Sequence, residues 1–215
     1  MELWHILNRG VEKRDIVIDD KDRIRFIHDL YALNDVNYAR HIYQPERRNE
    51  IQYERECLVD IHAFCLMNNH YHLLLSEAHE NGISLFMHKF NMGYAKYFNE
   101  RYERSGYLWQ GKHKKIRIVR DAHYMHIPFY IHLNPLDYEY HAWREGKVSH
   151  PEHALEYLHA YRWSSHLDYI GITNFPSITK RDDIGDLLGT PERYEKEIVR
   201  LIKNPSLAAA SNMLE

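Results

Sequence analysis

Residues 58–75, LVDIHAFCLMNNHYHLLL, constrain the fold of this chain more than any other stretch. Two apolar segments of strand length are separated by Asn68-Asn69, a pair that favours a turn because asparagine tolerates positive φ. The pattern predicts a β-hairpin whose first strand spans residues 58–66 and whose return strand begins at His70.

The segments around the hairpin alternate between strand and helix patterns. Residues 3–9 and 114–119 have strand character. Residues 19–33, 82–103 and 121–134 repeat apolar side chains at helical spacing. The first six elements follow the order of the ferredoxin-like split βαβ unit, so we expect an α+β protein with an antiparallel sheet and helices on one face. The expected apolar faces of the first two helices comprise Ile24, Ile27, Leu30, Tyr31 and Leu33, and Ile83, Phe86, Met87, Phe90, Met92, Tyr94 and Phe98.

The 215 residues suit one sizeable domain, or one domain with an appendage. We interpret residues 1–135 as the core, with a polar insertion near residues 34–56 that lacks clear periodicity. Residues 136–215 would form an appendage packed on the core, partly helical around residues 151–160 and 190–203.

Composition narrows the class of protein. Hydrophobic residues are 44% and charged residues 27%, a balance typical of globular proteins. No apolar run approaches the roughly 20 residues of a membrane span, and the first residues lack a secretory pattern, so we expect a cytoplasmic protein without a membrane partner. The two cysteines, Cys57 and Cys65, match no zinc or redox spacing and are expected to be buried small hydrophobes.

The formal net charge is −3, but residues 101–120 contain seven basic side chains against one acidic side chain. Aromatic residues lie among them, and this combination suits a phosphate backbone with unstacked bases. The alternative interpretation of the stretch is a solvated basic strand and loop. The alternative for its tryptophan is a position in the core. The candidate DNA-binding residues are Arg104, Trp109, Lys112, Lys114, Lys115 and Arg117.

The return strand of the hairpin carries His70 and His72 on the same face, because alternate residues of a strand point the same way. Two neutral imidazoles on one rigid face can hold a divalent cation, with water or phosphate oxygens as further ligands. The alternative is a pair of ordinary, partly buried histidines, because about one such pair is expected by chance among 17 histidines. His62, His123 and His126 share this ambiguity.

Five segments in order resemble the HUH single-tyrosine transposases of the insertion-sequence and REP-associated group. The hairpin AFCLMNNHYHLLL is similar to the family's strand, Met-Pro-Asn turn and His-hydrophobic-His strand, with Asn68 in place of the proline and Tyr71 between the histidines. The other four segments are HILNRG, GYLWQGKHKKIRIV, FYIHLNPL and YRWSSHLDYIG.

The resemblance implies a metal-dependent enzyme that cleaves and rejoins single-stranded DNA with hairpin structure through a covalent 5′-phosphotyrosine. It implies that Tyr130 is the nucleophile and that His70 and His72 hold Mg²⁺ or Mn²⁺. Asn134 is expected to complete the metal site, and His126, on the same helical stripe, is its alternative. The alternative nucleophiles are Tyr124, Tyr138 and Tyr140.

Two departures from the family pattern concern the catalytic helix. Pro128 should kink or restart this helix, and the segment up to His150 reads as an insertion. Three other functions stay open at this point: a non-catalytic protein that binds DNA or RNA hairpins, a hydrolase of small phosphoesters, and a structural protein with core histidines. Relatives occur as monomers and as homodimers, so either state is compatible with the sequence.

Overall fold

The computed structural model describes residues 1–37, 55–119 and 121–204 and shows an α+β fold built on a four-stranded antiparallel sheet. The strands are β1 (Trp4–Arg9), β2 (Val59–Leu66), β3 (His70–Glu77) and β4 (Lys114–Arg117). Their spatial order, β2-β3-β1-β4, is the order expected for a split βαβ unit. The strongest sequence pattern forms the β2-β3 hairpin, with β2 at one edge of the sheet, and the predicted fold class is confirmed.

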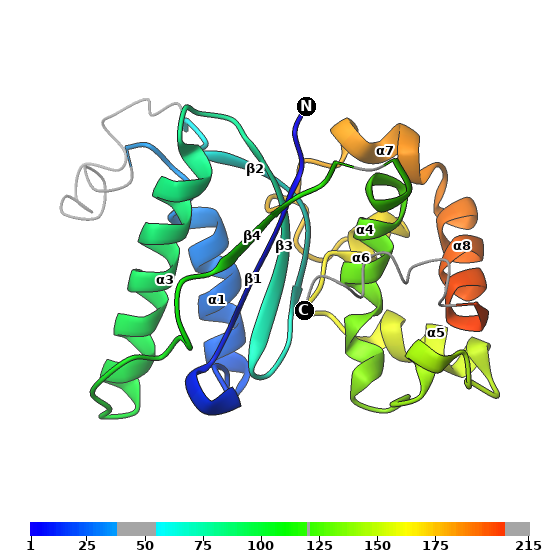
Figure 1. Cartoon of the computed structure of the whole chain (residues 1–215), viewed down its shortest axis with the longest axis horizontal. Coiled ribbons are helices and arrows are strands. Elements are labelled where there is room, and N and C mark those ends of the chain that lie inside the picture. The colour runs from blue at the N-terminus through cyan, green and yellow to red at the C-terminus, as the bar shows by residue number, and fades with distance from the viewer. Residues whose placement is uncertain (38–54, 120, 205–215) are drawn as a thin grey trace.

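Two long helices, α1 (Asp20–Ala32) and α3 (Gly82–Arg101), cover one face of the sheet (Figure 1). Their buried side chains and those of the sheet form a single apolar cluster around Phe26 and Phe90. The predicted faces were wrong at three positions, because Ile24, Tyr31 and Met92 are 56%, 42% and 61% exposed. Helix α1 instead turns Phe26 and two carboxylates toward the core, which the apolar pattern alone could not indicate.

The opposite face of the sheet is covered by helix α4 (Asp121–Leu133) and by the segments that follow it (Figure 1). Helix α4 runs unbroken through Pro128, so the expected restart at this proline does not occur. The short 3-10 turns and later helices are η1 (Val11–Lys13), η3 (Asn134–Asp137), η4 (Trp143–Glu145), α5 (Pro151–Ala160), α6 (His166–Tyr169), α7 (Asp182–Leu188) and α8 (Pro191–Lys203).

The part of the chain after Leu133 shares its apolar core with the sheet. Leu3 and Leu74 of the sheet side cluster with Leu158 of α5 and Ile198 of α8. A backbone hydrogen bond of 2.9 Å from the Leu66 amide to the Trp163 carbonyl ties the same segment to β2. The central part of the predicted insertion, residues 38–54, lies outside the described residues.

The turn of the hairpin differs in its backbone from the expectation. Neither Asn68 nor Asn69 has positive φ. The turn is held by other means: the Asn68 carbonyl accepts from the Ile16 and Val17 amides at 2.7 and 3.2 Å, and its side chain accepts from Arg23 at 3.0 Å. These contacts fix the start of β3, where the two histidines lie.

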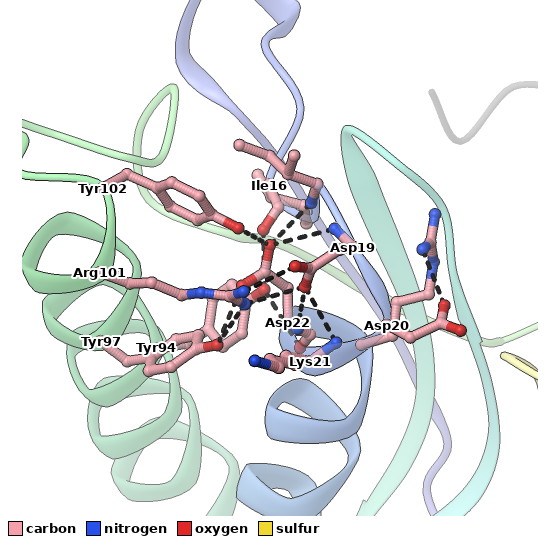
Figure 2. A network of polar contacts seen from close by, with 11 residues as sticks. Ile16, Asp19, Asp20, Lys21, Asp22, Tyr94, Tyr97, Arg101 and Tyr102 are labelled. Carbon is pink, nitrogen blue, oxygen red and sulfur yellow. Dashed lines mark hydrogen bonds and ion pairs between the residues drawn. The ribbon is translucent and has the colours of Figure 1, made fainter.

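A buried carboxylate joins the two helices of the first layer (Figure 2). Asp22 of α1 accepts hydrogen bonds from the Tyr97 and Tyr102 hydroxyls at 2.9 and 2.7 Å and pairs with Arg101. Arg101 also binds the Asp19 carboxylate. Two hydroxyl groups and one guanidinium donate to Asp22, so its buried negative charge is compensated. Arg101, one of the basic residues of the 101–120 stretch, is therefore used within the fold.

A second buried polar network ties the C-terminal helices to α4. His132 of α4 lies 2.7 Å from the Tyr194 hydroxyl of α8 and 2.6 Å from the Ser165 hydroxyl. The same tyrosine hydroxyl lies 3.2 Å from Nδ1 of His166. Burial lowers the pKa of His132 well below its usual value of 6.5 and that of His166 to about 3. Both histidines are therefore neutral in the folded chain at neutral pH.

This network predicts that acid weakens the fold. Because the folded-state pKa of His132 and of His166 lies below the unfolded-state value, the unfolded chain binds more protons below pH 6.5, and stability present above that pH is lost as the pH falls. We expect each histidine to cost roughly 2 kcal/mol of unfolding free energy between pH 7.5 and 5.0. Urea denaturation at both pH values measures it.

The matched comparison is His166→Asn, which should lessen the loss of stability on acidification. The exposed His153 has no such environment, so His153→Asn should leave the pH dependence unchanged. Equal pH dependence in the wild type and His166→Asn would contradict this account.

Among the described residues, no helix has the length and the apolar composition that crossing a bilayer requires. Cys65 is buried, whereas Cys57 is half-buried, and neither forms a disulfide.

Candidate functional site

The histidine pair lies on the face of the sheet that α4 covers. His70 and His72 project to the same side of β3, with ring centroids 5.0 Å apart. Tyr71 points to the other side, into the cluster with Phe26, and donates its hydroxyl to the Asn91 side chain at 2.8 Å. The alternation of a strand therefore places the two imidazoles together, as the sequence predicts.

A third histidine, His5 of β1, lies against the pair. Its Nε2 is 2.9 Å from Nδ1 of His72, and the two rings stack with centroids 5.1 Å apart. Burial, aided by the nearby Lys114 charge, lowers the pKa of His5 to about 3. Burial, with the charges of neighbouring histidines and arginines, also lowers the pKa of His72 well below its usual value. Both rings are thus neutral, the form in which imidazole can bind a metal.

The donor atoms at this site suit a divalent cation. Nε2 of His72 is buried and has no hydrogen-bond partner among the described residues, while its Nδ1 is engaged by His5. Nδ1 of His70 lies 2.6 Å from the Asn69 side-chain oxygen. Metal-binding histidines commonly use one nitrogen for the metal and the other for such an orienting contact.

Protein ligands alone do not complete the site. Within the described ranges no group of three His, Cys, Asp or Glu side chains is placed to hold a metal ion. A cation held by His70 and His72 would therefore take its remaining ligands from water or from substrate oxygens.

Tyr130 of α4 lies against the histidines. Its ring centroid is 5.9 Å from that of His72 and 6.0 Å from that of His5, in edge-on contacts. The side chain is fully buried. The guanidinium of Arg144 lies over the same ring, 5.3 Å from its centroid. The structure thus brings a phenol, an imidazole pair and a guanidinium together.

Asn134 is placed differently from the expectation. Its NH₂ group donates to the Tyr130 carbonyl at 2.8 Å, and its amide oxygen, the expected metal ligand, accepts from Arg144 at 3.0 Å. Arg144 is held in turn by the Asp137 carboxylate, with contacts of 2.8 and 3.1 Å. The amide oxygen therefore positions the guanidinium in this arrangement.

His126, the alternative third ligand, faces away from the pair. It lies in a pocket with Phe129 of α4 and with Arg193, Glu197 and Arg200 of α8. Although His126 and Tyr130 are one turn apart, the ring of His126 turns toward α8. In this arrangement His126 does not share a pocket with the histidine pair.

The alternative nucleophiles have other surroundings. The Tyr138 hydroxyl accepts from the Asn68 amide at 2.5 Å, and burial raises the pKa of Tyr138 to about 12. Tyr140 packs edge-on against Tyr157. The side chain of Tyr124 lies outside the described residues. Of the described tyrosines, Tyr130 is the one in ring contact with His72.

A basic groove lies on the same face as the histidines. Its lining includes Arg9, Lys112 and Lys114, and it encloses about 310 Å³. Leu7 of β1 is paired with His72 on one side and with Lys114 on the other, and directly paired residues of antiparallel strands share a face. Lys114 therefore lies on the face that carries the histidine pair, and Lys112 lines the same groove.

The other predicted DNA-binding residues are engaged in the fold. Lys115 and Arg117 point to the opposite face, where Lys115 pairs with Glu77 at 3.5 Å and Arg117 pairs with Glu2. Arg104 donates to the Asn99 side chain at 2.6 Å. Trp109 packs on the apolar cluster, and its indole N–H donates to the Asn91 carbonyl at 2.9 Å. Trp109 is half-buried, so part of its ring packs on the core, as the alternative interpretation expects, and part lies at the surface.

Sequence reasoning missed three residues of this site. His5 and Arg9 lie on the expected first strand at alternate positions, so strand periodicity could have placed them on one face. Arg144 lies in the presumed insertion, and no local pattern relates it to Tyr130, from which it is separated by 14 positions.

Comparison with known proteins gives one family. Residues 43–134 match the family described as "Transposase IS200 like", a range that includes the histidine pair, Tyr130 and Asn134. This match confirms the predicted resemblance to single-tyrosine transposases and supports a transposase-type, DNA-binding function.

A solved structure, "Structure of the REP associates tyrosine transposase bound to a REP hairpin", is similar at 13% identity with a TM-score of 0.47. The similarity covers 81% of this chain and 83% of that chain. A search among curated proteins finds no match.

The geometry predicts which histidines bind a cation. We expect His72→Phe, which keeps a ring of similar size but has no donor atom, to weaken Mn²⁺ binding at least roughly 100-fold. His5→Phe, which removes only the orienting contact, should weaken binding about tenfold. Isothermal titration calorimetry measures both, with unfolding curves as a check on folding.

His126→Phe is the matched control and should bind Mn²⁺ as the wild type does, because His126 faces α8. Loss of binding in His126→Phe, or wild-type binding in His72→Phe, would contradict the assignment.

Proposed function

From the match of residues 43–134 to IS200-like transposases, we propose that this chain cleaves and rejoins single-stranded DNA through a covalent 5′-phosphotyrosine on Tyr130. The observation that carries the proposal is the contact between the Tyr130 ring and His72, with their centroids 5.9 Å apart. A nucleophile for a phosphodiester must lie beside the group that binds the phosphate, and this contact supports that placement.

The histidine pair is the proposed metal site. His70 and His72 would hold Mg²⁺ or Mn²⁺, and His5 would orient the ring of His72 through its Nδ1. When bound, such a cation polarises a non-bridging oxygen of the scissile phosphate.

Tyr130 would supply the covalent step. The phenol loses its proton and its oxygen attacks the phosphorus in line, the bond from phosphorus to the 3′ oxygen breaks, and the released 3′ oxygen takes up one proton, so the proton count is unchanged. A 3′-hydroxyl can later attack the phosphotyrosine, which restores a phosphodiester and returns the phenol. The two steps conserve the number of phosphodiester bonds, so no nucleotide cofactor is required.

Arg144 would stabilise the charge that develops on Tyr130 and on the phosphate. Its guanidinium lies over the phenol ring and is held by Asp137 and Asn134. A cation fixed in a water-poor site stabilises a phenolate and presents several donors to a phosphate. The proposal gives Asn134 a positioning role in place of the metal-binding role.

Access to Tyr130 requires a local movement. The side chain is fully buried, so a phosphate can reach its hydroxyl only when a covering group moves. Arg144 is carried by the short turn Trp143–Glu145, outside the sheet and α4. We propose that this turn moves when DNA enters and that Arg144 then contacts the phosphate.

The basic groove would carry the strand to the site. Arg9, Lys112 and Lys114 line it on the face of the histidines, and the described residues contain no carboxylate within ion-pairing distance of these three groups. Cations along a groove bind the phosphate backbone without reading its sequence. The partner is therefore proposed to be single-stranded DNA, with a hairpin at the recognised end as the family resemblance implies.

The nucleophile is tested with labelled single-stranded DNA from the flanks of the chain's own gene, incubated with Mn²⁺. We expect a protein-linked label on a denaturing gel with the wild type and none with Tyr130→Phe, because only the hydroxyl can form the ester. Tyr138→Phe is the matched control and should still form the adduct.

Three outcomes separate the alternatives. An adduct that survives Tyr130→Phe assigns the nucleophile elsewhere. Metal-dependent cleavage without an adduct indicates hydrolysis. Hairpin binding with neither adduct nor cleavage indicates a non-catalytic binding protein.

The role of Arg144 gives a kinetic prediction. Arg144→Met should slow adduct formation roughly 100-fold, because a fixed cation near the developing charge is lost. The pH at which the rate stops increasing should be higher in Arg144→Met than in the wild type, since the phenol loses a neighbouring positive charge. Single-turnover rates measured across pH test both effects.

Asp137→Asn serves as the comparison for Arg144→Met. It removes the carboxylate that holds Arg144 but keeps the cation, so its rate should lie between those of the wild type and Arg144→Met. An unchanged rate and pH profile in Arg144→Met would remove Arg144 from the reaction.

A further inference from the structure

A second pocket lies on the other side of the loop that borders the basic groove. It encloses about 400 Å³ between helix α3 and residues 109–113. Its side chains include His88, Asn91 and Met92 from the helix and Trp109 and His113 from the loop. Neither the histidine pair nor Tyr130 contributes to this pocket.

The pocket and the groove are neighbours because they share residues. Gly111 and Lys112 line both. The loop therefore borders the basic groove on one side and this pocket on the other, with Lys112 at both. A strand whose phosphate contacts Lys112 would have a base within reach of this pocket.

The chemistry of the lining suits a flat, uncharged, polar ring. The Trp109 ring is fixed by its hydrogen bond to the Asn91 carbonyl, and Met92, which is 61% exposed, adds an apolar, polarisable surface. Such surfaces stack on bases of any sequence. Its lining contains no acidic side chain, so a nearby phosphate is not repelled.

Polar groups are available for the edges of the ring. The Asn91 side-chain oxygen accepts from Tyr71, but among the described residues nothing accepts from its NH₂ group. Burial, with the charges of Lys112 and Lys115, lowers the pKa of His113, so its imidazole is neutral and can both donate and accept. His88 is exposed at the rim.

We propose that this pocket binds one unpaired nucleobase of the DNA strand whose phosphates occupy the basic groove. The proposal rests on the proposed function, because it requires single-stranded DNA in that groove. It assigns to α3 and residues 109–113 a role in base recognition that is separate from the chemistry at Tyr130.

The test uses fluorescent single-stranded DNA from the gene's flanks in which one base at a time is replaced by an abasic site. This change keeps the phosphates and removes one ring. Anisotropy titrations should show a loss of affinity of roughly tenfold at one position with the wild type, the effect expected for one stacked base.

Ser84→Trp fills the pocket from the helix side, because Ser84 lines it and is exposed. This variant should bind the intact strand roughly tenfold more weakly and should show no further loss at the abasic position. Leu85→Trp, on the same helix but outside the pocket, is the matched control and should behave as the wild type. Unfolding curves establish that both variants fold.

If Ser84→Trp binds the intact strand as tightly as the wild type does and still loses affinity at the same abasic position, the base pocket is overturned. The adduct assay on the same wild-type preparation keeps the two proposals apart. If the adduct forms and no abasic position matters, the base pocket fails and the proposed function stands. If DNA binds with a pocket-dependent abasic position but no adduct forms, the base pocket stands and the chemistry fails. No DNA binding by the wild type overturns both.

Discussion

The pairing of β1 with β3 is the constraint on which the candidate site depends. The register sets Leu7 opposite His72 and Arg9 opposite His70, so the histidine pair, His5 and the basic groove share one face. A slip of one residue would turn every side chain of β3 to the other face and place Tyr71, instead of the two histidines, on the face that α4 covers. The register is secured at the turn, where the Asn68 carbonyl accepts from the Ile16 and Val17 amides. Contacts outside the hairpin thus determine which residues of HYH can act together.

Burial gives this site both its order and its main restriction. His5 and His72 are neutral because α4 and the following segment exclude water from their face of the sheet. The same covering buries Tyr130 completely. The part of the chain that covers the site also supplies Arg144, and the network around His132 and Tyr194 fixes α8 to α4 behind it. Residues after Leu133 therefore contribute to the site as well as to the stability of the fold.

The sequence predicts those parts of the structure that depend on local periodicity. Strand alternation is sufficient to place His70 and His72 together, and helical spacing places α3 and α5 within a residue or two of their bounds. Prediction from local periodicity fails where tertiary contacts determine the position of a side chain. The exposure of Ile24 and Met92 depends on which arc of each helix meets the sheet, and the contact of Arg144 with Tyr130 depends on a chain path that no motif encodes. Asn134 shows both cases. Helical spacing predicts its position next to Tyr130, but the contact of its amide oxygen with Arg144 depends on tertiary structure.

Charge in this protein acts through its distribution rather than its sum. The chain carries a formal net charge of −3, and within the basic stretch Arg101, Lys115 and Arg117 are paired with carboxylates of the fold. Lys112 and Lys114 remain at the groove, joined there by Arg9 from β1. The charges of Arg9 and Arg144 also disfavour protonation of His72, which keeps its imidazole in the metal-binding form. The cations that would attract a phosphate therefore also keep the imidazole of His72 neutral, so the groove and the histidine pair are coupled through the electrostatics of one face of the sheet.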